Sequence, residues 1–278
     1  MACKTQKWIR NKLAVTAAEN AAPKAPILFR GEMGKSLRDA KAIGYEALEV
    51  HVPDIWKFDA AALAKSCRTA GMGIASLVSG QLNVRMGLSL SHDDPDNVAK
   101  AVEGLKRFVD AAAVTESGVV VGWVRGQLGD KPEERLAQQG RALQEVDKLA
   151  AAKNVPLFIE AINRYELDSL NNARQILDFI EKYELTQAFV HLDTFHMNLE
   201  EYSPSKAIRQ CGEKLGYIHL ADNTRWYPGH DRLDFDEVFS ALAEIGYPGY
   251  VAVECLPYPD GTEAARQAYA YLSHRYFY

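Results

Sequence analysis

The sequence has few cysteines, no excess of basic residues and no long hydrophobic run. Its four cysteines form no CxxC pair, which is typical of reduced thiols in a cytoplasmic protein. Lys and Arg number 32 against 37 Asp and Glu, giving a net charge of −5, so we expect no nucleic-acid partner. No apolar segment approaches the ~20 residues needed to span a bilayer. We therefore predict a cytoplasmic protein with no membrane partner.

Two nucleotide-binding signatures are also missing. No GxGxxG follows a predicted strand and no P-loop is present, so the sequence shows neither signature of a nucleotide-binding fold. The composition, 47% hydrophobic and 25% charged, is that of a globular chain, and 278 residues can form one large domain or two small ones. Residues 1–12 are polar and basic with no apolar core of a secretory signal behind them. We expect a flexible leader at 1–12 and a single catalytic domain at 13–278.

Short apolar runs alternate with longer segments whose apolar residues recur at helical spacing. Several runs are apolar without alternation, as expected for strands of a parallel sheet that are buried on both faces. Eight runs and eight helical segments favour a (β/α)8 TIM barrel, because a doubly wound sheet of this length would usually have fewer strands. The predicted strands are 13–16, 47–52, 73–78, 118–124, 156–159, 188–192, 216–220 and 250–253. The predicted helices are 35–43, 60–70, 95–114, 132–153, 170–183, 204–213, 235–245 and 263–276.

Four consecutive predicted strands end in a charged or imidazole side chain: Glu160, Asp193, His219 and Glu254, spaced 33, 26 and 35 residues apart. Because barrel strands all end on the same face, we expect the four side chains to converge there. Three carboxylates and an imidazole would repel one another and lose solvation unless a cation neutralised them. The pattern therefore predicts a divalent metal site, with Mn²⁺ favoured and Mg²⁺, Co²⁺ or Zn²⁺ as alternatives.

Helix caps or ion pairs would explain any one of these residues, but the metal site explains all four together. Further polar residues follow the ligands: His196 after Asp193, Arg225 after His219, and Glu166 after Glu160. A loop histidine and surface ion pairs are the alternative interpretations of these three. His191, on the strand face shared with Asp193, is interpreted as a packed, hydrogen-bonded or supporting histidine.

The strings IEAINRYE, LDTFHMNLEE, IHLADNTRWYPG and VAVECLP carry these residues, and GLSLSH and GWVRG accompany them. Together they resemble the xylose-isomerase-like sugar isomerase and epimerase superfamily, in particular its ketose 3-epimerases and 5-keto-L-gluconate epimerases. The resemblance implies Glu160, Asp193, His219 and Glu254 as metal ligands, with Glu160 and Glu254 also acting as the acid/base pair. It implies substrate contacts from His196, Arg225 and Glu166.

The chain departs from the family pattern at two positions. Ala161 replaces a common proline, and Pro228-Gly229-His230-Asp231 replaces the usual Pro-Gly-x-Gly loop. At Asp231 we expect either a turn conformation that Asp tolerates or a different loop.

The resemblance implies inversion of the carbon beside a ketone in a keto-sugar acid, such as 5-keto-L-gluconate or D-tagaturonate, or in a ketose. Arg125, just past the fourth strand, is a candidate anchor for the substrate carboxylate, with an exposed loop arginine as the alternative.

Aldose–ketose or hydroxypyruvate-type isomerisation by the same residues remains open, as does a barrel that binds a sugar acid without catalysis. An apurinic endonuclease, which has a histidine-rich multi-zinc site, is disfavoured by the acidic chain and its seven histidines. Members of the superfamily are often dimers or tetramers, so we expect a homo-oligomer. The C-terminal aromatic residues could serve such an interface or pack on the barrel; they are Tyr269, Tyr271, Tyr276, Phe277 and Tyr278.

Overall fold

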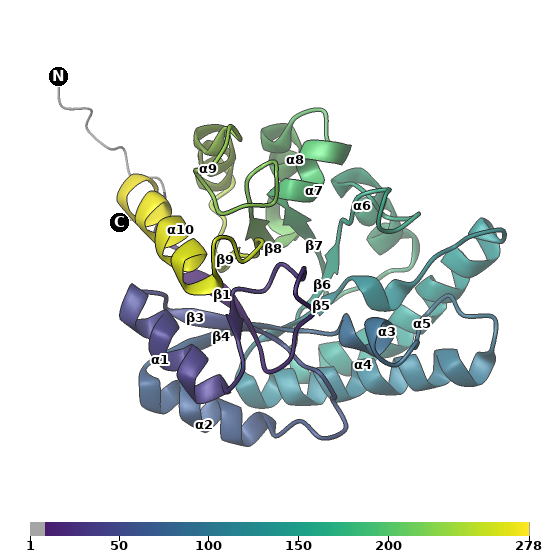
Figure 1. The fold of residues 1–278 in the computed structure, drawn as a ribbon. Coiled ribbons are helices and arrows are strands. Elements are labelled where there is room, and N and C mark those ends of the chain that lie inside the picture. Colours follow the sequence, from purple (N-terminus) through teal and green to yellow (C-terminus); the bar gives the residue numbers. More distant parts are fainter. Residues whose placement is uncertain (1–8, 278) are drawn as a thin grey trace.

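Eight parallel strands form a closed barrel in the order of the sequence, because β1 pairs with both β3 and β9 (Figure 1). The structure, a computed structural model, describes residues 9–277. A two-residue strand, β2, extends the sheet beside the end of β1. The predicted TIM barrel is therefore confirmed. The strands are β1 (Leu13–Ala18), β2 (Phe29–Arg30), β3 (Ala47–His51), β4 (Gly73–Val78), β5 (Gly118–Val121), β6 (Leu157–Glu160), β7 (Ala188–Asp193), β8 (Leu215–Leu220) and β9 (Val251–Val253).

Helices between the strands cover the outside of the barrel (Figure 1). Three of them begin at a proline, namely Pro95, Pro132 and Pro204, and Gly71 ends another with φ 63°. Two short helices, α3 and α7, lie in βα loops and have no counterpart in the prediction. The helices are α1 (Met33–Ile43), α2 (Ala60–Ala70), α3 (Gln81–Val84), α4 (Pro95–Thr115), α5 (Pro132–Lys153), α6 (Ala173–Lys182), α7 (Thr194–Glu200), α8 (Pro204–Cys211), α9 (Phe235–Glu244) and α10 (Gly261–Arg275), with 3-10 turns at Trp123–Arg125 and Gly212–Lys214.

Side chains fill the interior of the barrel. Phe158 of β6 and Tyr217 of β8 stack there with ring centroids 5.0 Å apart. Small residues of the facing strands, such as Ala14 and Ala252, leave room for the two rings. At Gly118 a side chain would meet the ring of Phe158, since an added Cβ would lie 2.1 Å from it. The interior is thus a packed core, and open space is left above it, at the carboxyl ends of the strands.

The two ends of the described chain meet on the barrel. Ile9 forms a bridge with Phe277, and the Asn11 amide donates to the carbonyl of Tyr247 at 2.8 Å. Of the leader expected at 1–12, residues 9–12 are therefore in contact with the domain, while residues 1–8 lie outside the described residues. Tyr276 is buried and stacks on Phe239 with centroids 4.1 Å apart, so this part of the aromatic C-terminal segment packs on the barrel.

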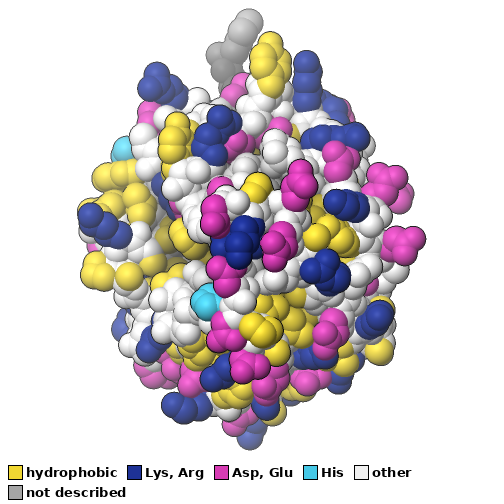
Figure 2. All heavy atoms as spheres, turned by 90° about the vertical axis from the view of Figure 1, so that its right-hand side faces the viewer, with side chains coloured by type: hydrophobic (Ala, Val, Ile, Leu, Met, Phe, Trp, Pro, Cys, Tyr) yellow, Lys and Arg dark blue, Asp and Glu magenta, His cyan; other side chains and the backbone are white. Residues whose placement is uncertain are grey.

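Acidic and basic side chains are interspersed over the face shown in Figure 2. Within residues 9–277 no helix is long and apolar enough to cross a membrane.

Cys67, Cys211 and Cys255 are free and buried, as expected for packing residues.

Candidate active site

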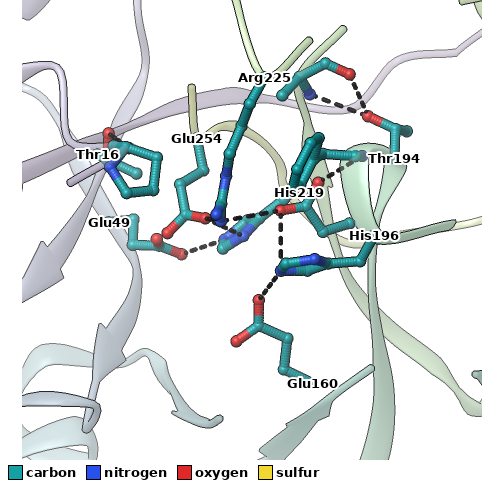
Figure 3. Close-up of polar contacts among 12 residues, drawn as sticks. Thr16, Glu49, Glu160, Thr194, His196, His219, Arg225 and Glu254 are labelled. Atoms are coloured by element: carbon teal, nitrogen blue, oxygen red, sulfur yellow. Dashed lines mark hydrogen bonds and ion pairs between the residues drawn. The ribbon is translucent and has the colours of Figure 1, made fainter. Parts of the chain in front are cut away.

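The four predicted ligands converge at one end of the barrel. Glu160 and Asp193 are the last residues of β6 and β7, His219 lies one residue before the end of β8, and Glu254 directly follows β9. One ligand atom from each of the four lies within 4.8 Å of the others. All four side chains are buried. The shared direction of the strands therefore produces a compact set of three carboxylates and one imidazole (Figure 3).

Two atoms of this set are left without hydrogen-bond partners. Asp193 Oδ2 and His219 Nδ1 are both buried, and neither has a partner among the described residues. A buried polar atom without a partner costs about 1–3 kcal/mol, and more when it is charged. A cation at this position would contact both atoms, and the oxygen-rich donor set suits Mn²⁺ or Mg²⁺. The residues present therefore fit a divalent metal ion.

The carboxylates of the set differ in their electrostatics. Burial, followed by the charge of Glu254, raises the pKa of Glu160 well above its usual range. Burial also raises the pKa of Asp193 to about 6. Burial alone would raise the pKa of Glu254 as well, but His219 and Arg225 lower it to about 2. The set thus holds one readily ionised carboxylate and two that retain protons easily until a cation neutralises them.

His196, Arg225 and Glu166, the residues expected to contact substrate, line a cavity together with Glu160 and Glu254. The Arg225 guanidinium donates to Glu254 Oε2 at 3.1 Å and to Glu166 Oε1 at 3.3 Å, and it lies over the ring of Phe195. Arg225 has φ 63°, a left-handed conformation that costs a residue with a side chain about 1–3 kcal/mol. These contacts hold the guanidinium over the site despite that cost.

His196 is oriented by a residue that sequence reasoning missed. The Asn163 amide donates to His196 Nδ1 at 2.7 Å and to Glu166 Oε1 at 2.9 Å. His196 Nε2 then carries the hydrogen and faces Glu160 Oε1, 3.8 Å away. Burial lowers the pKa of His196 well below its usual range, which keeps the ring neutral. The available signal was the string NRYE, in which Asn163 lies three residues before the predicted Glu166.

Glu49 and His51 of β3 were also missed. Both belong to the site, although their strand lies across the barrel from β7. Glu49 is fully buried and accepts a hydrogen bond from His219 Nε2 at 2.8 Å (Figure 3). His51 lines the cavity, and its Nε2 lies 3.2 Å from Glu49 Oε1 and 3.6 Å from Glu254 Oε1. The available signal was a carboxylate and an imidazole, two residues apart, in a strand whose other residues are apolar.

Arg125 lies away from the cavity, which corrects its prediction as a substrate anchor. The side chain is fully buried, and its guanidinium donates to the carbonyls of Glu160 and Ser169, each at 2.9 Å. It is absent from the residues that line the cavity. The 3-10 turn Trp123–Arg125 follows β5 and places the side chain beneath the site. Arg125 supports the end of β6 and thereby the backbone of Glu160.

His191 lies beneath the ligands, packed as predicted. Its ring meets that of His219 edge to face, with centroids 4.1 Å apart. Neither ring nitrogen has a hydrogen-bond partner in the described chain, so the hydrogen-bonded interpretation is not supported. Burial lowers the pKa of His191 well below its usual range, and the ring is neutral.

The loop after β8 differs from the family pattern expected for it. Gly229 has φ 87°, but Asp231 is not among the residues with positive φ. The loop is instead organised by Asp222, whose carboxylate accepts the backbone N–H groups of Gly229, Asp231 and Leu233 at 3.0–3.1 Å. Asp231 therefore needs no left-handed conformation.

The cavity has a volume of about 570 Å³ and two chemically distinct ends. The carboxylates Glu160 and Glu254 line it and are buried, which defines the inner end. Lys24, in the loop between β1 and β2, and Arg85, directly after α3, line it with exposed side chains, which defines the outer end. The volume of this cavity lies within the range usual for pockets that bind small molecules.

Comparisons with known proteins place this chain in a family. Residues 37–274 match the family of xylose isomerase-like TIM barrels, and the chain belongs to that family. It is 30% identical to the L-ribulose 3-epimerase of Methylomonas sp. (strain DH-1) over 79% of this chain and 77% of that protein. It is 32% identical to the ketose 3-epimerase of Arthrobacter globiformis over 79% and 76%. A solved structure of L-ribulose 3-epimerase superposes with a TM-score of 0.81 at 26% identity, covering 95% of this chain and 93% of that one.

Proposed function

We propose that this protein is a metal-dependent sugar epimerase, which inverts the carbon beside the ketone of a small keto sugar. The observation that carries this proposal is the buried set of Glu160, Asp193, His219 and Glu254, with two of its atoms unpartnered below an open cavity. The kinship with ketose 3-epimerases supports the reaction class. The four residues would hold the ion, with Mn²⁺ favoured by the donor set.

The ion would polarise the ketone and stabilise the negative charge that develops as the adjacent C–H loses its proton. Glu254, whose pKa is about 2, is ionised and would remove that proton from one face. Glu160 lies on the other side of the ligand set, and a proton taken up by its carboxyl group during turnover would be delivered to the same carbon from the opposite face. In the reverse direction the two carboxyl groups exchange roles. Removal on one face and delivery on the other inverts the carbon.

The neighbouring side chains would orient the substrate between the two carboxyl groups. The Arg225 guanidinium bridges Glu254 and Glu166 and would donate to substrate oxygen atoms at the same edge of the cavity. His196 Nε2, fixed by Asn163, would donate to an oxygen near Glu160. His51 forms part of the opposite wall. The packed interior beneath the site would keep water from the reacting carbon.

For the substrate, we propose a keto-sugar acid of the 5-keto-L-gluconate or D-tagaturonate type. Lys24 and Arg85 line the outer end of the cavity, and within the described residues neither forms an ion pair with a carboxylate. The exposed end of the cavity thus carries positive charge, and the buried end carries carboxylates. A substrate with its ketone at the inner end and its carboxylate at the outer end would match this distribution. These two residues replace Arg125 as the proposed anchor.

Incubation of Mn²⁺-loaded protein with a panel of keto-uronates and neutral ketoses in D₂O tests the proposal. We expect deuterium at the carbon beside the ketone, accompanied by inversion at that carbon, and fastest with a keto-uronate. Deuterium that accompanies aldose–ketose interconversion would identify an isomerase instead. Binding of a sugar acid without any exchange would identify a non-catalytic barrel.

A further inference from the structure

Glu49 is a buried carboxylate that the proposed reaction does not use. It projects from β3 into the barrel with no exposed surface. Its Oε2 accepts hydrogen bonds from His219 Nε2 and from the Ser76 hydroxyl, both at 2.8 Å. Its Oε1 accepts from His51 Nε2 at 3.2 Å. One carboxylate thus contacts a proposed metal ligand, a cavity-wall histidine and a hydroxyl of the neighbouring strand β4.

We propose that Glu49 is a positioning residue that determines which nitrogen of His219 faces the metal. This inference rests on the proposed function. A carboxylate can only accept, so His219 Nε2 must carry a hydrogen to bond with Glu49. Only Nδ1 is then available to a cation. Nδ1 is buried without a hydrogen-bond partner and lies 3.6 Å from Glu254 Oε2, on the side of the other ligands (Figure 3).

The charge of Glu49 matters in addition to its geometry. A histidine whose second nitrogen donates to a carboxylate is a more basic ligand, and loss of such a partner typically weakens metal binding about 10–100-fold. Ser76 and His51 fix the carboxylate from β4 and from its own strand. The rotamer of Glu49 is therefore determined before any metal binds, and the orientation of His219 follows from it.

Glu49 itself could instead be a ligand of a second ion. Single ligand atoms of Glu49, His51 and Glu254 lie within 4.8 Å of one another. The 3.2 Å bond from His51 Nε2 to Glu49 Oε1 argues against this role, because an Nε2 atom that carries a hydrogen cannot bind an ion. The number of ions bound per chain separates the two roles: a positioning residue predicts one ion and a ligand predicts two.

Glu49→Gln is the informative variant, since it keeps the shape and an acceptor oxygen but removes the charge. Titration of the purified protein with Mn²⁺, followed by the electron paramagnetic resonance signal of the free ion, gives affinity and stoichiometry. We expect one ion per chain in the wild type and an affinity about 10–100-fold weaker in Glu49→Gln. Glu46→Gln, the same substitution at an exposed carboxylate directly before β3, is the matched control and should bind as tightly as the wild type.

Nitrogen NMR of the Zn²⁺-loaded wild type tests the same inference without a variant. We expect the His219 ring to carry its hydrogen on Nε2 and the metal on Nδ1. The reverse arrangement, two ions per chain, or wild-type affinity in Glu49→Gln would overturn the role of Glu49 and leave the epimerase proposal standing. Absence of Mn²⁺ binding by the wild type would overturn the metal-dependent function itself.

Discussion

At the scale of single residues, the surroundings of Glu160 and Glu254 shift the pKa values of these two carboxyl groups in opposite directions. Burial and a like charge raise the pKa of Glu160. At Glu254 the effect of burial is outweighed by His219 and Arg225, which lower the pKa. A pair of carboxyl groups with different proton affinities is what an acid and a base on opposite faces of a carbon require. The asymmetry comes from the neighbours contributed by other strands.

Glu160→Gln and Glu254→Gln should each lower kcat by at least ~10², because a general acid or base contributes about that much. Both substitutions keep the size of the side chain, so the thermal unfolding midpoint of the metal-free protein should stay close to that of the wild type. Turnover and unfolding are measured in parallel, with the exposed Glu145→Gln as the control. Near-wild-type turnover in either variant would refute the assignment of two opposed carboxyl groups.

Arg85→Gln should raise KM for a keto-uronate about 10-fold, since a hydrogen bond to a charged group contributes about 1.5–3 kcal/mol. KM for a neutral ketose should not change, because that substrate offers no carboxylate to the outer end of the cavity. Arg107→Gln, at an exposed helical ion pair, is the control. Equal effects on the two substrates would contradict the proposed recognition of an acid.

The sequence predicted the residues whose position depends only on where strands end. Glu160, Asp193, His219 and Glu254 follow from that rule. Glu49 could not be found in the same way, because its partner His219 lies 170 residues away on a different strand. Arg125 was misplaced because the direction of its side chain is set by a 3-10 turn that sequence periodicity does not reveal.

At the scale of elements, strands and long helices match the prediction closely, and the βα loops do not. The bounds of α2, α5 and β4 agree with the predicted ranges, since apolar periodicity and Pro or Gly signals define them. Strand β5 ends at Val121, three residues earlier than predicted, where the turn that holds Arg125 begins. Loop structure depends on contacts between distant segments, which local patterns do not contain.

The structure of the loop after β8 should depend on the carboxylate of Asp222. In Asp222→Ala four backbone N–H groups lose their acceptor, so we expect stability to fall by about 2 kcal/mol. Hydrogen exchange of residues 223–233 should accelerate, and kcat should fall because Arg225 lies in this segment. Exchange by mass spectrometry and urea unfolding measure the two effects. Asp231→Ala retains these acceptors and is the control; equal protection of the loop in both variants would contradict this role.

At the scale of the whole molecule, closure of the barrel brings ligands from four strands to one face, so metal binding and folding should be linked. Mn²⁺ at ~100 times its Kd should stabilise the fold by about 2.7 kcal/mol, which is several degrees in Tm for a chain of this size. Chelation should remove both this stabilisation and the activity, and Mn²⁺ or Co²⁺ should restore them. Scanning calorimetry with and without chelator measures the shift; an unchanged Tm would contradict the linkage.

This stabilisation should depend on pH. Burial raises the pKa of Asp193 to about 6, so this carboxyl group binds a proton as the pH falls through 6, and the raised pKa of Glu160 favours protonation of a second ligand. Protons then compete with the cation, because the ligands must lose them to bind. The Mn²⁺-induced rise in Tm should be large at pH 8 and shrink progressively below pH ~6. A rise that is independent of pH between 5 and 8 would show that other groups bind the ion.

Anomalous X-ray diffraction from crystals grown with Mn²⁺ tests the central claim most directly. The account predicts one strong peak per chain, within ~2.0–2.6 Å of side-chain atoms of Glu160, Asp193, His219 and Glu254, with Nδ1 as the histidine ligand. A map with no peak among these four residues at saturating Mn²⁺, or with its only peak elsewhere on the chain, would contradict it.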